Sequence, residues 1–165
     1  MVRATDHEQT DAGRTPAVNA HSMEQVLTHL SRFRAATLRE LARWYGPRDW
    51  QVAPNVPAFG RAAVDDDDRP DAETVSLGTV YFDGAYPASL RRSAADTVAR
   101  TGESFGFTEL VIQQDSTDGI AFAGRHPDGH TYRFGIGATT VLSVRSGPAE
   151  WAGEPYTDPP EEPRR

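Results

Sequence analysis

The sequence predicts an α+β fold, in which an antiparallel sheet of about four strands is covered on one face by two helices, in the order α-β-α-β-β-β. Three observations lead to this class: an apolar helical stripe over residues 22–45, a second helical repeat near Pro87, and strand-like runs between turn residues from about residue 108 onward. Because helix-rich and strand-rich stretches are largely segregated, an antiparallel sheet is favoured over alternating βαβ units.

The first helix is expected at residues 22–45. Its large apolar residues recur mainly three or four positions apart, which places them on one helical face. Ser22 suits the N-cap, with Gln25 placed to complete a capping box, and Gly46-Pro47 ends the helix. The apolar positions are Met23, Val26, Leu27, Leu30, Phe33, Leu38, Leu41, Trp44 and Tyr45.

Residues 46–73 are expected to form a long loop, because prolines break every regular pattern in this stretch. A loop of this length is uncommon inside a compact domain. We therefore expect the large apolar residues from Trp50 to Phe59 to pin it against the core. The tip at 60–72, which holds the acidic run 65–68, is expected to be mobile.

A strand and a second helix come after this loop. The β-branched and aromatic run at 74–82 predicts the strand, and Asp83-Gly84 ends it. Pro87 suits the first turn of a helix, and Gly102 is expected to cap the other end. The helical repeat consists of Leu90, Ala94, Val98 and Thr101.

The last third of the chain predicts a meander. Its glycine-containing run GIG indicates a bulge or bend within the final strand. Strands are expected at 108–114, 120–125 and 131–145, with hairpin turns at 115–119 and 126–130. Beyond the bend two strand registers stay open. In one, Thr139 and Val141 face the core, and in the other Leu142 and Val144 do.

One domain is expected at residues 21–151, because both ends are poor in large apolar residues. Four of the 12 prolines fall within 153–165. Such segments bury too little apolar surface to offset the entropy of ordering. Residues 1–20 and 152–165 are therefore expected to be disordered tails.

The composition excludes several classes of protein. With no cysteine among 165 residues, disulfide scaffolds, cysteine-based zinc sites and thiol catalysis are ruled out. A net charge of −7 argues against general nucleic-acid binding. No apolar run is long enough for a transmembrane segment. All 17 cationic side chains are arginine, which indicates a high-GC, actinobacterial genome.

No residue pattern predicts a catalytic, cofactor or metal site. His126 and His130 flank a tight turn and would need a third ligand, for which only Asp128 lies near, so we interpret the pair as turn residues. The acidic run Asp65–Asp68 lacks the spacing of a calcium loop. There is no G-x-S-x-G motif, and the run GIGATT does not continue as a dinucleotide fingerprint.

An aromatic cluster gives one candidate surface. Trp44, Tyr45, Trp50 and Arg48 gather where the first helix meets the loop. Aromatic residues and arginine are enriched at interfaces, so the cluster is a candidate ligand or partner surface. The alternative is that these side chains close one end of the core.

Several short motifs together resemble a known family. The run RWYG, the step VYFDGAYP into the second helix, and the runs DGHTYRF and TTVLSVRSG are similar to the small actinobacterial lipoproteins of the LppA type, over about residues 22–150. The resemblance implies an envelope-associated α+β domain and supplies no catalytic residues. Where that group has a Thr/Ser-Gly-Cys step, this chain reads Ser146-Gly147-Pro148.

These observations favour a non-catalytic α+β binding domain without metal or cofactor, acting on an unidentified protein or small molecule. As the sequence is written, with no apolar leader, the expected location is cytoplasmic, and it is the cell envelope if a leader has been removed. An immunity-type or inhibitor protein with an acidic surface is the alternative, and a small hydrolase is the third. Oligomeric state stays open.

Overall fold

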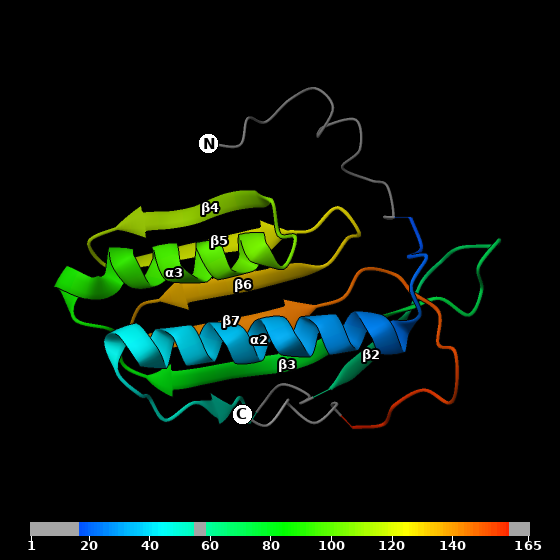
Figure 1. Ribbon diagram of the computed structural model, residues 1–165, viewed down its shortest axis with the longest axis horizontal. Coiled ribbons are helices and arrows are strands. Elements are labelled where there is room, and N and C mark those ends of the chain that lie inside the picture. Colours follow the sequence, from blue (N-terminus) through cyan, green and yellow to red (C-terminus); the bar gives the residue numbers. More distant parts are fainter. Residues whose placement is uncertain (1–16, 55–58, 159–165) are drawn as a thin grey trace.

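The structure is a computed structural model that describes residues 17–54 and 59–158. Two α-helices lie side by side on one face of a single antiparallel sheet, which confirms the α+β class (Figure 1). The helices are α2 (Met23–Tyr45) and α3 (Arg91–Ser104), with a short 3-10 turn η1 (Ala88–Leu90) before α3. The strands are β1 (Gln51–Val52), β2 (Gly60–Ala63), β3 (Glu73–Asp83), β4 (Glu109–Ser116), β5 (Gly119–Arg125), β6 (Thr131–Ile136) and β7 (Thr139–Arg145).

The sheet has seven strands in the described part of the chain, more than the expected four or so. The strand order is β1-β3-β7-β6-β5-β4, and β2 also pairs with β3. Strand β3 therefore lies between β7 on one side and both short strands on the other, so that only the meander β4 to β7 keeps the order of the sequence.

Two of the extra strands lie within the expected loop at 46–73. Strand β1 pairs with β3 near Val80, and β2 pairs with it along Glu73 to Ser76. The prolines that suggested a loop fall between these strands or outside them. Residues 55–58 of the stretch expected to pin the loop lie outside the described residues.

The third extra strand arises because the expected strand at 131–145 is two strands. A tight turn at Gly137-Ala138 reverses the chain, and β6 pairs antiparallel with β7 from Thr131–Arg145 to Ile136–Thr140. Of the two glycines in this segment, Gly137 marks the turn of a hairpin, and Gly135 lies within β6, paired with Val141. Apolar alternation continues through such a turn, so pattern alone does not separate the two cases. The register is now fixed: Leu142 and Val144 face the core.

The predicted cap of α2 is confirmed, and the predicted cap of α3 is not. Ser22 caps α2 as predicted, with the full Ser22–Gln25 capping box. The expected cap at Gly102 is wrong, because α3 continues to Ser104 and the left-handed glycine is Gly106, at φ 94°. Gly102 instead lies buried against the Tyr132 ring, where a Cβ would leave no room.

The core lies between the helices and the sheet. Alternate residues of β3, β5, β6 and β7 meet the apolar stripe of α2 and the small residues of α3, which is the arrangement that the two periodicities predicted. Its largest fully buried side chains are Tyr86, Tyr132, Phe33, Phe107, Phe134, Met23, Leu27, Leu30, Leu41, Ile136, Leu142 and Val75.

The ends of the described chain make defined contacts beside the start of α2. Asn19 is buried and its backbone N–H donates to Pro148 O, so this part of the expected 1–20 tail is ordered. Ala152 N–H and Gly153 N–H donate to the Glu24 carboxylate, so the start of the expected 152–165 tail is ordered as well. Residues 1–16 and 159–165 lie outside the described residues. Within the described residues, no helix has both the length and the apolar character needed to cross a membrane.

Candidate functional site

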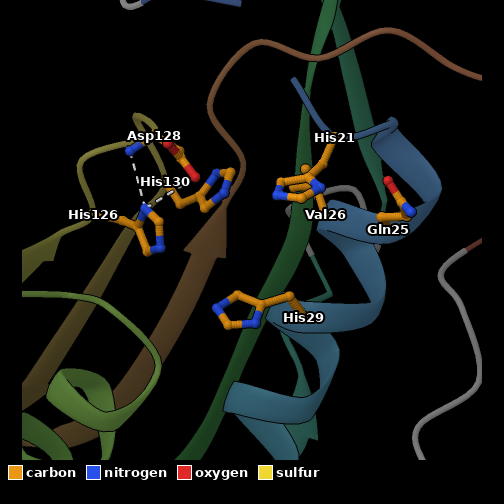
Figure 2. Close-up of a pocket in the computed structure, with 7 residues that line it drawn as sticks. All are labelled: His21, Gln25, Val26, His29, His126, Asp128 and His130. Atoms are coloured by element: carbon orange, nitrogen blue, oxygen red, sulfur yellow. Dashed lines mark hydrogen bonds and ion pairs between the residues drawn. The ribbon is translucent and has the colours of Figure 1, made fainter. Parts of the chain in front are cut away.

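A cavity of about 320 Å³ lies between the first turns of α2 and the turn that joins β5 to β6 (Figure 2). Four of the five histidines of the chain line it. We call it the histidine cavity, and its lining consists of His21, Gln25, Val26, His29, His126, Asp128 and His130.

One wall of the cavity comes from the start of α2 and the residue before its cap. Gln25 and His29 are four residues apart, which places them above one another on the helix, and His21 lies just before the N-cap Ser22. His29 Nε2 lies 2.7 Å from Phe105 O. Because a carbonyl only accepts, Nε2 of His29 must carry a proton.

The opposite wall is the tight turn at His126–His130, which the sequence predicted. His126 N–H donates to His130 O, and Gly129, at φ 89°, completes the reversal. Within the turn, Asp128 N–H donates to His126 Nδ1 at 3.0 Å. The Asp128 carboxylate is half exposed, with Oδ2 3.7 Å from that same ring nitrogen. The turn thus presents two imidazoles and a carboxylate to one space.

The segment after β7 packs against the His126–His130 turn and hydrogen-bonds to it. Gly147 N–H donates to Nδ1 of the buried His130 at 2.8 Å. The Asn19 side chain donates to Asp128 O at 3.0 Å. Gly147 passes so close to the turn that a Cβ there would collide with Asp128 O. Two segments distant in sequence, one before α2 and one after β7, therefore hold this turn in place.

The protonation states of the two turn histidines are set by these contacts. Burial, with a smaller contribution from His126, lowers the pKa of His130 to about 4. Burial also lowers the pKa of His126, against the opposing charge of Asp128. Both rings are therefore neutral at pH 7, and because each Nδ1 accepts a backbone N–H, the remaining proton of each ring lies on Nε2.

The turn has the composition and spacing of a metal-binding group. His126, Asp128 and His130 each offer a ligand atom, and these atoms all lie within 4.8 Å of one another. The sequence identified this trio and interpreted it as turn residues. It gave no reason to add His21 and His29, because nothing in the sequence near them indicates that the start of the first helix meets this turn.

The aromatic cluster at the other end of α2 is divided by the structure. Trp44 is 61% exposed, and its indole donates to Glu40 in a groove between α2 and α3. Tyr45 is half-buried and hydrogen-bonds Thr97 at 2.8 Å. Trp50 packs edge-on against a core ring.

Arg48 belongs with the core side of this cluster. Its guanidinium lies 4.7 Å from the centre of the Tyr86 ring and 5.7 Å from that of Phe82. It also donates to the carbonyl oxygens of Tyr45, Gly46 and Pro47. Arg48, Tyr45 and Trp50 thus close the end of the core, and the four residues do not converge on one surface. Their role in binding stays a prediction.

The acidic run at 65–68 folds back on itself. The Asp66 carboxylate accepts the N–H groups of Asp68 and Arg69, at 2.9 and 3.2 Å. Arg69 pairs with Glu150 on the exposed surface. These contacts shape a turn between β2 and β3 and do not gather carboxylates around one point.

Comparison with known proteins identifies one family. A family model described as LppA, a lipoprotein confined to pathogenic Mycobacterium, matches residues 2–148. No curated protein matches the chain. The crystal structure of the lipoprotein LppA from Mycobacterium tuberculosis has a similar fold, with a TM-score of 0.65, 16% identity and 88% of each chain covered. A DUF4853 family protein from Actinomyces odontolyticus gives a TM-score of 0.59, 12% identity and coverage of 89% of this chain and 79% of that one.

Proposed function

The chain belongs to the LppA family of lipoproteins, and from that premise we propose that it is a non-catalytic binding domain of the cell envelope, with the histidine cavity as its ligand site. The observation that carries the binding role is the convergence of four histidines from separate parts of the sequence on one cavity. Family membership supports the envelope location.

The hydrogen bonds of the cavity support binding rather than covalent catalysis. A hydrolytic triad requires a hydroxyl or thiol nucleophile hydrogen-bonded to a histidine base. The bonds that hold His29, His126 and His130 go to backbone groups, and in the described part of the chain none joins these rings to a serine or threonine hydroxyl. Their function is to position the rings, which suits a preformed binding site.

The binding role is tested by screening a library of small polar fragments with protein-observed NMR. Fragments that bind are expected to move the amide signals of Asp128, which lines the cavity, and of Gly129 and Gly147, which adjoin its lining residue His130. Replacing Val26 by Phe should narrow the cavity and weaken these fragments, whereas Trp44→Ala should not. Binding confined to the groove beside Trp44, or the absence of any hit, would contradict the proposal.

The location is tested separately from the ligand. The gene, with its natural upstream sequence, is expressed in an actinobacterial host, and the cells are fractionated. We expect the protein in the membrane and cell-wall fraction. Recovery in the cytosolic fraction alone would refute the envelope assignment and would leave the cavity result unaffected.

A further inference from the structure

We propose that the histidine cavity binds a divalent transition-metal ion, represented by Zn²⁺, with His126, Asp128 and His130 as its protein ligands. The inference rests on the proposed binding role of the cavity and names the chemical class of its ligand. It departs from the sequence-based expectation that the chain holds no metal.

The donor types fit this class of ion. Imidazole nitrogen and carboxylate oxygen are common zinc ligands, and three protein ligands with one open position form the usual arrangement where a further molecule binds. The open side faces the histidine cavity, across which His29 and His21 lie (Figure 2). The trio is also selective against Mg²⁺ and Ca²⁺, which prefer all-oxygen sites.

The spacing is close to that of a bound ion. With metal–nitrogen bonds of 2.0–2.1 Å, two ligand atoms on a tetrahedral zinc lie about 3.3 Å apart, and the centres of two bound imidazoles lie about 5 Å apart. His126 Nδ1 and Asp128 Oδ2 are 3.7 Å apart, and the His126 and His130 ring centres are 4.7 Å apart. Small side-chain rotations would close the trio around an ion.

The scaffold restricts these side chains before any ion arrives. His130 is almost fully buried, and the His126 side chain is only 15% exposed. Both lie in a turn that two backbone hydrogen bonds define and that Asn19 holds from outside. Surface histidines that bind metals adventitiously lack such restraint, so the entropy cost of assembling this site is reduced.

Metal binding has a structural consequence at Gly147. A neutral imidazole has one lone pair. If the ion binds His130 Nδ1, it takes the lone pair that accepts Gly147 N–H. If it binds Nε2, the ring proton moves to Nδ1 and the same bond is lost. Either way, zinc binding releases Gly147 N–H, and the same argument applies to Asp128 N–H on His126.

The first test measures zinc affinity of the tag-free full chain by calorimetry, with a competing chelator. We expect one ion per chain. Asp128→Asn and His126→Gln should each weaken binding by about tenfold or more, because each removes one ligand. Asp118→Asn, which removes an exposed carboxylate in the turn between β4 and β5, should leave the affinity unchanged. Circular dichroism confirms that the variants fold. Equal affinity in all four proteins, or no binding, would overturn the proposal.

The second test uses the wild-type protein alone, so it does not depend on the folding of a variant. Addition of Zn²⁺ is expected to shift the amide signals of Gly147 and Asp128 and to leave those of the β4–β5 turn in place. A zinc titration that leaves Gly147 unmoved would refute the assignment of His130. Fragment binding without zinc binding would overturn the metal proposal while the proposed binding role stands, so the two failures are distinguishable.

Discussion

The two ends of α2 use similar side chains for different purposes. At the N-terminal end, histidines from the helix and from the β5–β6 turn surround a cavity, and backbone groups occupy their bonding positions. At the C-terminal end, Tyr45, Arg48 and Trp50 lie against core rings, while Trp44 projects outside.

The difference shows that a cluster of chemically versatile residues in sequence is a weak guide to a site. The residues of the aromatic cluster are close together in the sequence, and most of them pack against the end of the core. The histidine cavity is assembled from segments about 100 residues apart, and its rings are held by backbone bonds rather than by packing alone. What separates the two ends is the space left between the side chains, which depends on how the sheet and helices meet.

The largest expected effect concerns how deeply each half of α2 is buried. Leu30 is fully buried in the half near the histidine cavity, whereas Leu38 in the other half is only partly buried. Leu30→Ala is expected to lower the free energy of unfolding by about 2–5 kcal/mol, and Leu38→Ala by less. Urea denaturation of both variants measures the difference. Equal losses would mean that the two halves are buried alike.

The second prediction concerns the loss of stability at acid pH, and it applies only to the end of α2 that borders the histidine cavity. The pKa of His130 is about 4 in the folded protein against an ordinary 6.5. A base whose pKa falls on folding binds more protons when unfolded, so the unfolding free energy rises with pH between these values. Stability should therefore be lost as pH falls from 6.5 to about 4, by an amount on the order of 3 kcal/mol.

Denaturant melts of the wild type and of one variant at several pH values test this. His130→Gln should flatten the dependence of stability on pH. If the wild type were equally stable at both ends of the window, the ring would not be held neutral by burial.

The third prediction compares two glycines. Gly147 has no room for a Cβ beside the turn, whereas Gly137 has open space around it. Gly147→Ala is expected to destabilise the fold by about 1–3 kcal/mol through overpacking, and Gly137→Ala by far less. Thermal melts of the pair give the comparison. Similar melting temperatures would show that the segment after β7 does not hold the turn closely.

The smallest expected effects lie at the aromatic end. Tyr45→Phe removes the hydrogen bond to Thr97 and should cost about 0.5–1.5 kcal/mol. Trp44→Ala removes an exposed side chain and should change stability by less than about 0.5 kcal/mol. If chemical denaturation shows Trp44→Ala to be the costlier change, the division of this cluster into a closing part and an exposed part is wrong.

Local features of the fold were predictable from the sequence, and long-range ones were not. The Ser22–Gln25 capping box and the His126–His130 turn depend on residues close together in the chain, and both were predicted with their partners. The short strands β1 and β2 were missed because they become strands only by pairing with β3. The two residues of β1 carry no periodicity of their own.

In the candidate site, too, the residues close together in the sequence were predicted and the distant ones were not. His126, Asp128 and His130 were identified as a group because one turn holds them. Their neighbours on α2 were not, since nothing in the spacing of His29 indicates that β6 and β7 place this turn beside the first helix. In the sequence, Gly147 is notable only because Pro148 follows it where the resembling lipoproteins have a cysteine. Its hydrogen bond to His130 depends on the close approach of Gly147 to the turn, which only the tertiary structure creates.

The bonds at the start of α2 also bear on how the chain is made. Met23 N–H donates to Glu150 O, and Asn19 N–H donates to Pro148 O. During synthesis the ribosome releases this helix on the order of ten seconds before those carbonyls exist. Until then the first turn of α2 relies on Ser22 and water for its N–H groups. The first turn of α2 therefore gains these backbone partners only after the segment that follows β7 has been synthesised.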